Sequence, residues 1–97
     1  MVPFAPGGGT DILGRLLGQK LGDRFGKSFV VENRPGAGTV TAAVQVAKSA
    51  PDGHTIMHGH IGVLAFNPTL YPSLPYDPAT AFAPIASIAT VPNIIAV

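Results

Sequence analysis

The sequence predicts an α/β fold of three layers, in which helices cover both faces of a mostly parallel sheet. Short apolar runs alternate with segments of helical periodicity in the order β-α-β-α-β-(α)-β, which is typical of such a sheet. A glycine-rich loop follows each of the first three apolar runs. Because right-handed crossovers bring the carboxyl ends of parallel strands to one edge, we expect the three loops to share the edge where such sheets bind ligands.

The first expected strand begins at Val2 and runs into Gly7-Gly8-Gly9-Thr10-Asp11. Glycine removes the side chains that would cover the backbone N–H groups, and Thr10 or Asp11 is a suitable N-cap for the next helix. The free amides and the positive end of the helix dipole would favour a carboxylate or a phosphate. For Asp11 a second interpretation stays open, in which it holds a water or an ammonium group of the ligand.

The segment from Thr10 to Phe25 is predicted to be an amphipathic helix, because its leucine and isoleucine residues follow the i, i+3, i+4 pattern. Gly14, Gly18 and Gly22 form a stripe along this helix, which indicates close packing on the sheet. Gly26 is expected to end it in the left-handed conformation.

The second expected strand covers residues 28–32 and leads into a loop at 33–39, where Thr39 is expected to cap a helix from about Val40 to Ser49. Arg34 in this loop is either a cationic partner for a ligand carboxylate or a solvated side chain. The third expected strand covers residues 55–58.

The third loop, Gly59-His60-Ile61-Gly62, is expected to precede a short helical segment that covers residues 63–66 and ends at Asn67-Pro68. His54, His58 and His60 resemble a metal cluster, but no fourth ligand for a tetrahedral site is evident. We therefore expect no metal, and we expect His60, in a loop at the binding edge, to touch the ligand.

The last part of the chain is predicted to hold a single helical turn from Asp77 to Phe82, followed by extended apolar runs at 85–89 and 94–97. No charged residue follows Asp77. The chain is 46% hydrophobic and only 11% charged, so this segment should expose an apolar patch that further protein or a second copy covers. Pro84 and Pro92 interrupt it, which argues against a membrane span.

Several classes of function are excluded by what the sequence lacks. The net charge is only +1 and the six Lys and Arg residues are scattered, so a nucleic-acid partner is not expected. The glycine loops match neither the dinucleotide nor the phosphate-loop fingerprint. There is no cysteine and no serine in a nucleophile elbow. We therefore expect neither a cofactor nor a catalytic residue, and we recognise no secretory signal before the first strand.

Six motifs in this order and spacing resemble the tripartite tricarboxylate transporter receptors, also called the Bug family. They are Pro3-Phe4-Ala5-Pro6-Gly7-Gly8-Gly9-Thr10-Asp11, Val31-Glu32-Asn33-Arg34-Pro35-Gly36-Ala37-Gly38, Ala50-Pro51-Asp52-Gly53, Asn67-Pro68-Thr69-Leu70-Tyr71, Leu74-Pro75-Tyr76-Asp77-Pro78 and Phe82-Ala83-Pro84-Ile85. The resemblance implies a fold like domain 1 of a type II periplasmic binding protein. Residues 1–97 would form the amino-terminal portion of that domain, with domain 2 and the carboxyl-terminal part absent.

The resemblance also implies a function. Such a receptor is periplasmic, is not an enzyme, uses no cofactor, and delivers a small carboxylate or an amino acid to membrane permease subunits. The residues that it implies in ligand binding are Ala5, Gly7, Gly8, Gly9, Thr10, Asp11, Gly59, His60, Ile61 and Gly62. Relatives often carry Thr or Ser where His60, Ile61 and Val63 stand here, which points to a different ligand. The alternative hypothesis is a ligand-blind module that self-associates through its uncharged carboxyl-terminal segment.

Overall fold

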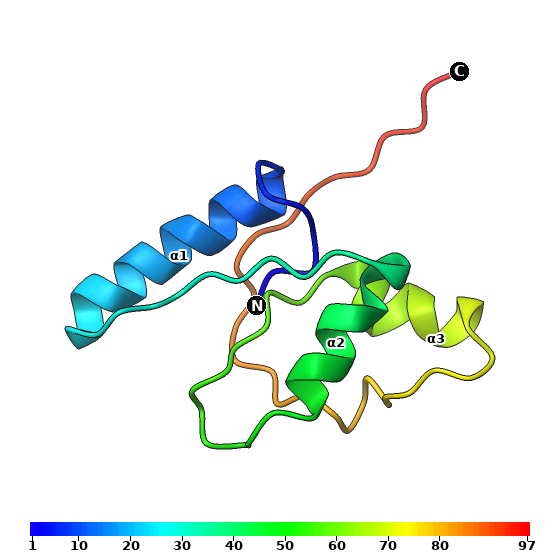
Figure 1. Cartoon of the computed structure of the whole chain (residues 1–97). Coiled ribbons are helices and arrows are strands. Elements are labelled where there is room, and N and C mark those ends of the chain that lie inside the picture. Colours follow the sequence, from blue (N-terminus) through cyan, green and yellow to red (C-terminus); the bar gives the residue numbers. More distant parts are fainter.

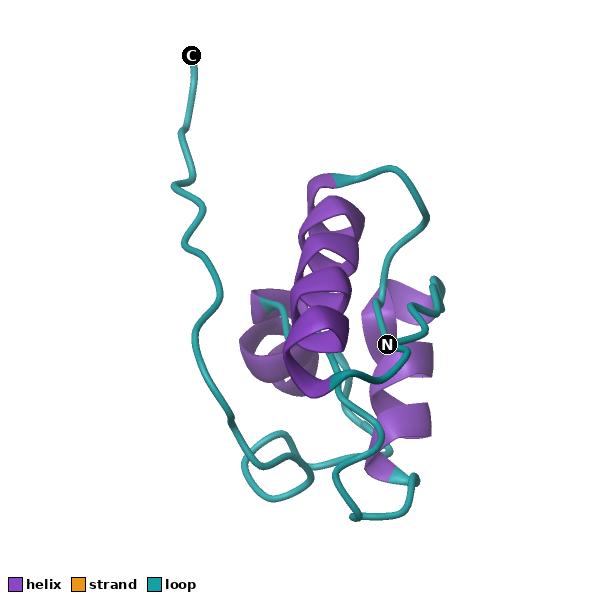
Figure 2. Ribbon diagram, turned by 90° about the vertical axis from the view of Figure 1, so that its left-hand side faces the viewer, coloured by secondary structure: helices purple, strands orange, loops and turns teal.

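The computed structural model describes residues 1–97 and contains helices and extended backbone without a regular strand (Figures 1 and 2). The longest element is α1 (Gly9–Phe25). Two short helices begin within or directly after the second loop, and two more begin at the end of the third or after it. They are η1 (Ala37–Thr39), α2 (Val40–Ala47), η2 (Gly62–Phe66) and α3 (Asn67–Leu70).

Helix α1 begins after Gly8, whose extended backbone (φ −80°, ψ 169°) makes it the N-cap. The expected capping by Thr10 or Asp11 is wrong, because the helix starts earlier and both residues lie in its first turn. No side chain caps this end, so the first amides of the helix have no intrahelical acceptor. The carboxyl end is as predicted, since Gly26 adopts the left-handed conformation with φ 62°.

The glycine stripe of α1 packs directly on the extended segments. A Cβ atom on Gly14 would lie 2.8 Å from a methyl carbon of Val2, and one on Gly18 would lie 3.3 Å from a methyl carbon of Val31. The predicted close approach is therefore confirmed. The leucine side of the helix is less covered than expected, because Ile12 is 61% exposed and Leu16 is 51% exposed.

Three extended segments lie side by side beneath α1. The amide of Val2 donates to the carbonyl of Glu32 (2.8 Å), and the amide of Arg34 donates to the carbonyl of Val2 (2.9 Å), which is the hydrogen-bond pattern of a parallel pair. On the other side, Met1 bonds the backbone of residues 56–58 through its amino group (2.7 Å) and its carbonyl (2.9 Å). The first segment therefore lies between the other two.

The predicted sheet is reduced to this pairing. The expected strands at 28–32 and 55–58 do not form. The segment that begins at Val2 pairs with the segment around residues 32–34 only through the isolated bridge between Val2 and Asn33. For residues 55–58 the physical reason is Pro3, which is the next residue after Met1 on that side and has no N–H group to donate to the carbonyl of His58.

The small apolar core lies on the side of these segments away from α1. Ala43 of α2, Val63 of η2 and Tyr76 are buried together, and Met57 packs against them. The next residue, His58, lies instead near Gly14 of α1. Because successive side chains of extended backbone point to opposite faces, the segments separate α1 from α2 and keep the layer order that the sequence predicts.

Three expected boundaries shift. Helix α2 ends at Ala47 rather than Ser49. Thr39 precedes α2 as expected, but it has a left-handed backbone (φ 77°) and its hydroxyl donates to the carbonyl of Gly38 instead of capping the helix. Asn67-Pro68 does not end the helical segment but begins α3, because proline is tolerated in the first turn of a helix.

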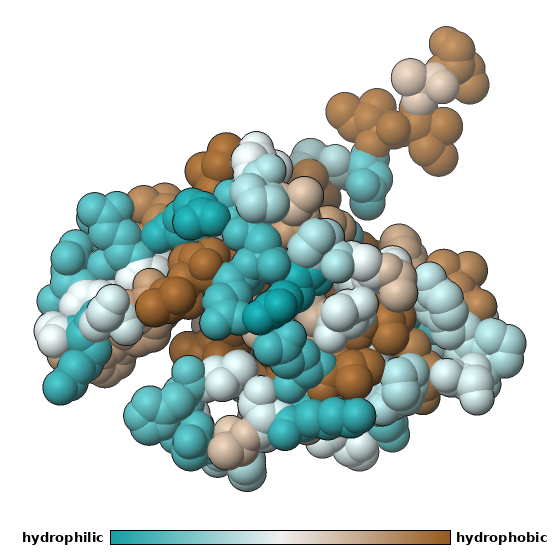
Figure 3. All heavy atoms as spheres, in the orientation of Figure 1, coloured by the Kyte–Doolittle hydropathy of each residue, from teal (hydrophilic) through white to brown (hydrophobic).

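The predicted turn after Asp77 is present. The Asp77 side chain accepts a hydrogen bond from the amide of Ala79 (3.0 Å), and its carbonyl accepts one from Ala81 (2.7 Å). Beyond residue 82 the backbone is extended, and Figures 1 and 3 show its apolar end projecting from the rest of the molecule. Ile94 is 87% exposed and Ile95 is 93% exposed, so the expected apolar surface is found here. None of the helices has the length and apolar character needed to cross a membrane.

Candidate functional site

The three glycine-rich loops lie next to one another, as their predicted positions required. The side-chain amide of Asn33, in the second loop, donates to the carbonyl of Phe4 beside the first loop (3.0 Å). The ring of Phe4 meets the ring of His60, in the third loop, edge to face with centroids 5.0 Å apart. Residues from all three loops therefore form one rim.

The first loop has unpaired backbone donors at this rim. The amides of Gly8, Gly9 and Thr10 have no hydrogen-bond acceptor in the protein. The first backbone hydrogen bond of the helix is donated by the amide of Ile12 to the carbonyl of Gly8 (3.0 Å). Gly8 and Gly9 are exposed. Because the positive end of the dipole of α1 adds to these donors, this end of the helix attracts an anion.

Other amides that we expected to be free are occupied. The amide of Gly7 donates to a carboxylate oxygen of Asp11 (2.9 Å), and the amide of Gly62 donates to Nδ1 of His60 (3.1 Å). In the second loop the amide of Thr39 donates to the carbonyl of Gly36 (2.9 Å). The recurrence of glycine loops therefore overstates how many donors the rim offers.

Asp11 has a different place from either of its two expected roles. It is only 3% exposed, and besides the Gly7 amide it accepts hydrogen bonds from Asn33 Nδ2 (2.9 Å) and Arg15 Nε (3.0 Å). The bonds from Gly7, Asn33 and Arg15, in this order of importance, lower the pKa of the Asp11 carboxyl to about 2. Asp11 is thus neither the N-cap nor an open group for a ligand.

A pocket of about 540 Å³ joins the first loop to the third. Gly9, Thr10 and Leu13 line one side of it, residues 58–61 line another, and the extended tail closes it through residues 89–91 and Asn93. Five of the predicted site residues are found here, namely Gly9, Thr10, Gly59, His60 and Ile61. The other five, Ala5, Gly7, Gly8, Asp11 and Gly62, lie outside its lining.

The sequence interpretation missed Leu13, His58 and the tail residues of this pocket. The sequence predicts His58 only as a possible metal ligand or a strand residue, and the tail only as an apolar run. Nδ1 of His58 is buried without a hydrogen-bond partner, and this burial is the main cause that lowers the pKa of the imidazole. The alternation of Met57 and His58 along one strand is the signal that could have placed His58 on the α1 side.

The three histidines do not come together as a metal site. His54 lies in an exposed turn, where its Nδ1 is 3.4 Å from a carboxylate oxygen of Asp52. The structure contains no group of three or more side chains arranged to hold a metal ion. Of the three, His60 is at the rim, as expected.

The second loop closes on itself and on the residues that follow the third loop. The buried side-chain amide of Asn67 donates to the carbonyl of Gly38 (3.0 Å) and approaches the hydroxyls of Thr39 and Tyr76 (3.3 Å each). Arg34 pairs with Glu32 (Nη2–Oε2 3.3 Å), so it follows the solvated alternative of its two expected roles.

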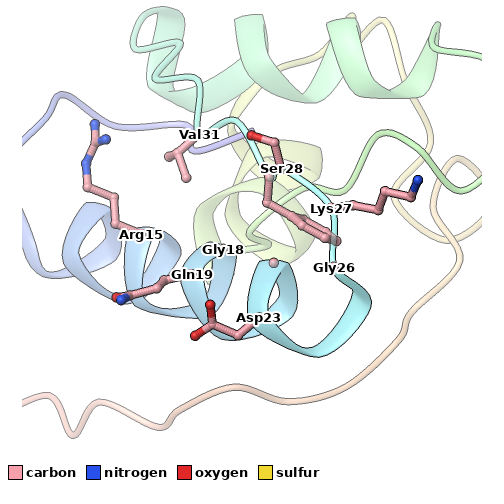
Figure 4. Close-up of a pocket in the computed structure, with 10 residues that line it drawn as sticks. Arg15, Gly18, Gln19, Asp23, Gly26, Lys27, Ser28 and Val31 are labelled. Carbon is pink, nitrogen blue, oxygen red and sulfur yellow. The ribbon is translucent and has the colours of Figure 1, made fainter.

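A second hollow, of about 510 Å³, lies toward the other end of α1 (Figure 4). Charged side chains of both signs line it, including Arg15, Asp23 and Lys27, and Phe29 and Val31 belong to its lining as well. It contains none of the predicted site residues and offers no concentration of one charge.

Comparisons with known proteins show to which family of proteins this chain belongs. The family described as tripartite tricarboxylate transporter family receptor matches residues 13–97, and the chain belongs to this family of solute-binding receptors. It is 40% identical over 96 residues to the protein BugT of Bordetella pertussis. It is 37% identical over 97 residues to a protein encoded in the tcbD-tcbE intergenic region of a Pseudomonas species.

One solved structure is similar in both sequence and shape. The structure of Rpa4515 of R. palustris with adipate matches with a TM-score of 0.77 and 45% identity, over 81% of this chain and 27% of that chain. The match supports a periplasmic-binding-protein fold. The alignments cover 98–100% of this chain but only 29% of the two curated relatives, so the chain spans less than a third of their length.

Proposed function

We propose that this chain captures a small carboxylate at the rim formed by residues 5–11 and 59–62, as part of a periplasmic receptor that delivers its ligand to transporter permease subunits. The observation that carries the proposal is the row of unpaired amides at Gly8, Gly9 and Thr10, beside the pocket that the third loop also lines. In this proposal the chain is a part of domain 1 and has no catalytic role.

The donors of the first loop suit a carboxylate better than a neutral ligand. Hydrogen bonds to an ionised acceptor are stronger than those between neutral groups, and the dipole of the 17-residue helix α1 adds to them. His60 supplies a further donor. Its Nδ1 accepts the hydrogen bond from Gly62, so a neutral ring carries its proton on Nε2, from which it can donate to a ligand oxygen.

The remainder of the pocket is apolar enough to hold a hydrocarbon chain. Leu13, Ile61 and Val91 line it next to the donors of the first loop. A ligand with a carboxylate and a short aliphatic body fits this combination. The relative Rpa4515, whose structure was solved with adipate, supports the same class of ligand.

Calorimetric titration of the chain with adipate tests the proposal, with 1,6-hexanediol as the matched control of equal carbon number and no charge. We expect heat and a saturable isotherm with adipate and none with the diol, because only the carboxylate can use the free amides. Equal responses to the two ligands, or no response to any of a series of dicarboxylates, would contradict the proposal.

A second candidate function is self-association through the uncharged segment after Asp77. The exposed isoleucines of residues 85–95 favour it, because contiguous apolar surface marks interaction sites. Light scattering coupled to size-exclusion chromatography separates the candidates. A dimer that does not respond to adipate supports association, and a monomer that binds adipate supports the receptor.

A further inference from the structure

Asp11 makes three side-chain hydrogen bonds at the rim, as many as Asn33. Its buried carboxylate accepts from a backbone amide of its own loop, from a side chain of the second segment and from Arg15 one turn along α1. Arg15 also donates to the side-chain oxygen of Asn33 (3.0 Å), so Asp11, Arg15 and Asn33 form a closed set of hydrogen bonds. The Asp11 carboxylate accepts these three hydrogen bonds and is only 3% exposed, so it is not open to a solute.

The Gly7 end of this network fixes an unusual piece of backbone. Gly7 has φ 94°, a conformation that only glycine adopts easily, and nothing within 4 Å would contact a Cβ placed there. In this conformation the Gly7 amide donates to Asp11, and Gly7 directly precedes the row of free amides.

The Asn33 end of the network fixes the same loop from the other side. Asn33 donates to the carbonyl of Phe4 as well as to Asp11, and its backbone forms the bridge to Val2. The loop from Phe4 to Gly7 is therefore held at both of its ends by groups that meet at one carboxylate.

We propose that Asp11 is a positioning residue that sets the direction of the free amides of Gly8, Gly9 and Thr10 without touching the ligand. The purpose of this role rests on the proposed function, since it assumes that the free amides bind a ligand. The hydrogen-bond network itself exists without a ligand. A preorganised set of donors binds more tightly, because no ordering cost is paid on binding.

Amide hydrogen exchange of the unmutated chain, followed by NMR, is the first test. The Gly7 amide is expected to exchange at least about tenfold more slowly than those of Gly8 and Gly9, because only the Gly7 amide is hydrogen-bonded. Exchange of Gly7 at the same rate as its two neighbours would overturn the proposal, and this test needs no substitution that could unfold the chain.

The second test compares Asp11→Asn with Asp23→Asn, which removes the same charge from an exposed position of the same helix. In Asp11→Asn the new NH2 group faces donors, so we expect protection of Gly7 to be lost and the amide resonances of Gly8, Gly9 and Thr10 to shift. Asp23→Asn should leave them in place. Unchanged resonances in Asp11→Asn, or equal changes in the two variants, would overturn the proposal.

Titration with adipate separates this proposal from the proposed function. We expect Asp11→Asn to weaken adipate binding about tenfold while Asp23→Asn does not, since a misdirected donor loses a charge-assisted hydrogen bond. Equal affinities of the two variants would overturn the positioning role. If the unmutated chain does not bind adipate, the proposed function is contradicted. The amide resonances of Gly8, Gly9 and Thr10 still decide whether Asp11 positions these amides.

Discussion

The first and second glycine loops have the same sequence chemistry but opposite hydrogen bonding. In the first, Gly8 and Gly9 keep free amides at the start of a long helix. In the second, the Thr39 amide bonds to Gly36 and the Gly38 carbonyl is held by the buried amide of Asn67. Glycine thus permits an open donor row but does not create one, and the nearby acceptors decide whether a loop binds or supports.

The largest effect that would sharpen this comparison is expected for Asn67→Ala. Asn67 is 3% exposed, and its loss would leave the Gly38 carbonyl without its side-chain donor and open a cavity beside Tyr76. We expect the free energy of unfolding to fall by about 2–3 kcal/mol. Urea unfolding measures this change, with the exposed Asn93→Ala as control, and equal midpoints for the two variants would contradict the supporting role of the second loop.

An intermediate effect is expected when alanine replaces glycine in each loop. Gly38 has φ 59°, and an added Cβ would lie 2.6 Å from the hydroxyl of Tyr71, whereas Gly9 has open space around it and lies in a helix. Gly38→Ala should cost about 1–2 kcal/mol of stability, and Gly9→Ala should cost none. Thermal unfolding of both variants checks this, and an equal loss would mean that the loops do not differ.

The smallest expected effect is the pH dependence of stability that Asp11 causes, which appears only in acid. Hydrogen bonds lower its folded-state pKa to about 2, below its value in the unfolded chain. Its stabilising contribution is therefore complete above about pH 4 and is lost as the pH falls toward 2. Urea unfolding at several pH values should show a steeper acid loss in the unmutated chain than in Asp11→Asn, and parallel curves would contradict the network.

The parts of the fold that depend on local periodicity could be predicted from the sequence. The leucine pattern and Gly26 gave α1 nearly to its ends, and the glycine stripe predicted its close packing on Val2 and Val31. The strand pattern counts apolar residues and does not weigh the missing amide of Pro3, which stops the pairing of the first segment with the expected strand at 55–58.

The site was predicted in part, for a related reason. The pattern identified Gly9, Thr10 and His60 at the pocket, since loops at strand ends meet at one edge. It could not tell a free amide from an occupied one, because the acceptor for Gly7 depends on Asp11, which Asn33, 22 residues away, holds in place. Long-range side-chain bonds of this kind leave no local periodicity.

The pair Gly9→Pro and Gly9→Ala tests the free-amide account most directly. Gly9 is the first helical residue, Gly8 before it has the extended backbone that proline requires, and no atom lies within 4 Å of a Cβ added at Gly9. Both variants should fold, and only Gly9→Pro lacks the amide hydrogen. The account predicts that Gly9→Pro binds adipate about tenfold more weakly than Gly9→Ala, by the loss of one charge-assisted hydrogen bond. Equal affinities in calorimetry would contradict it.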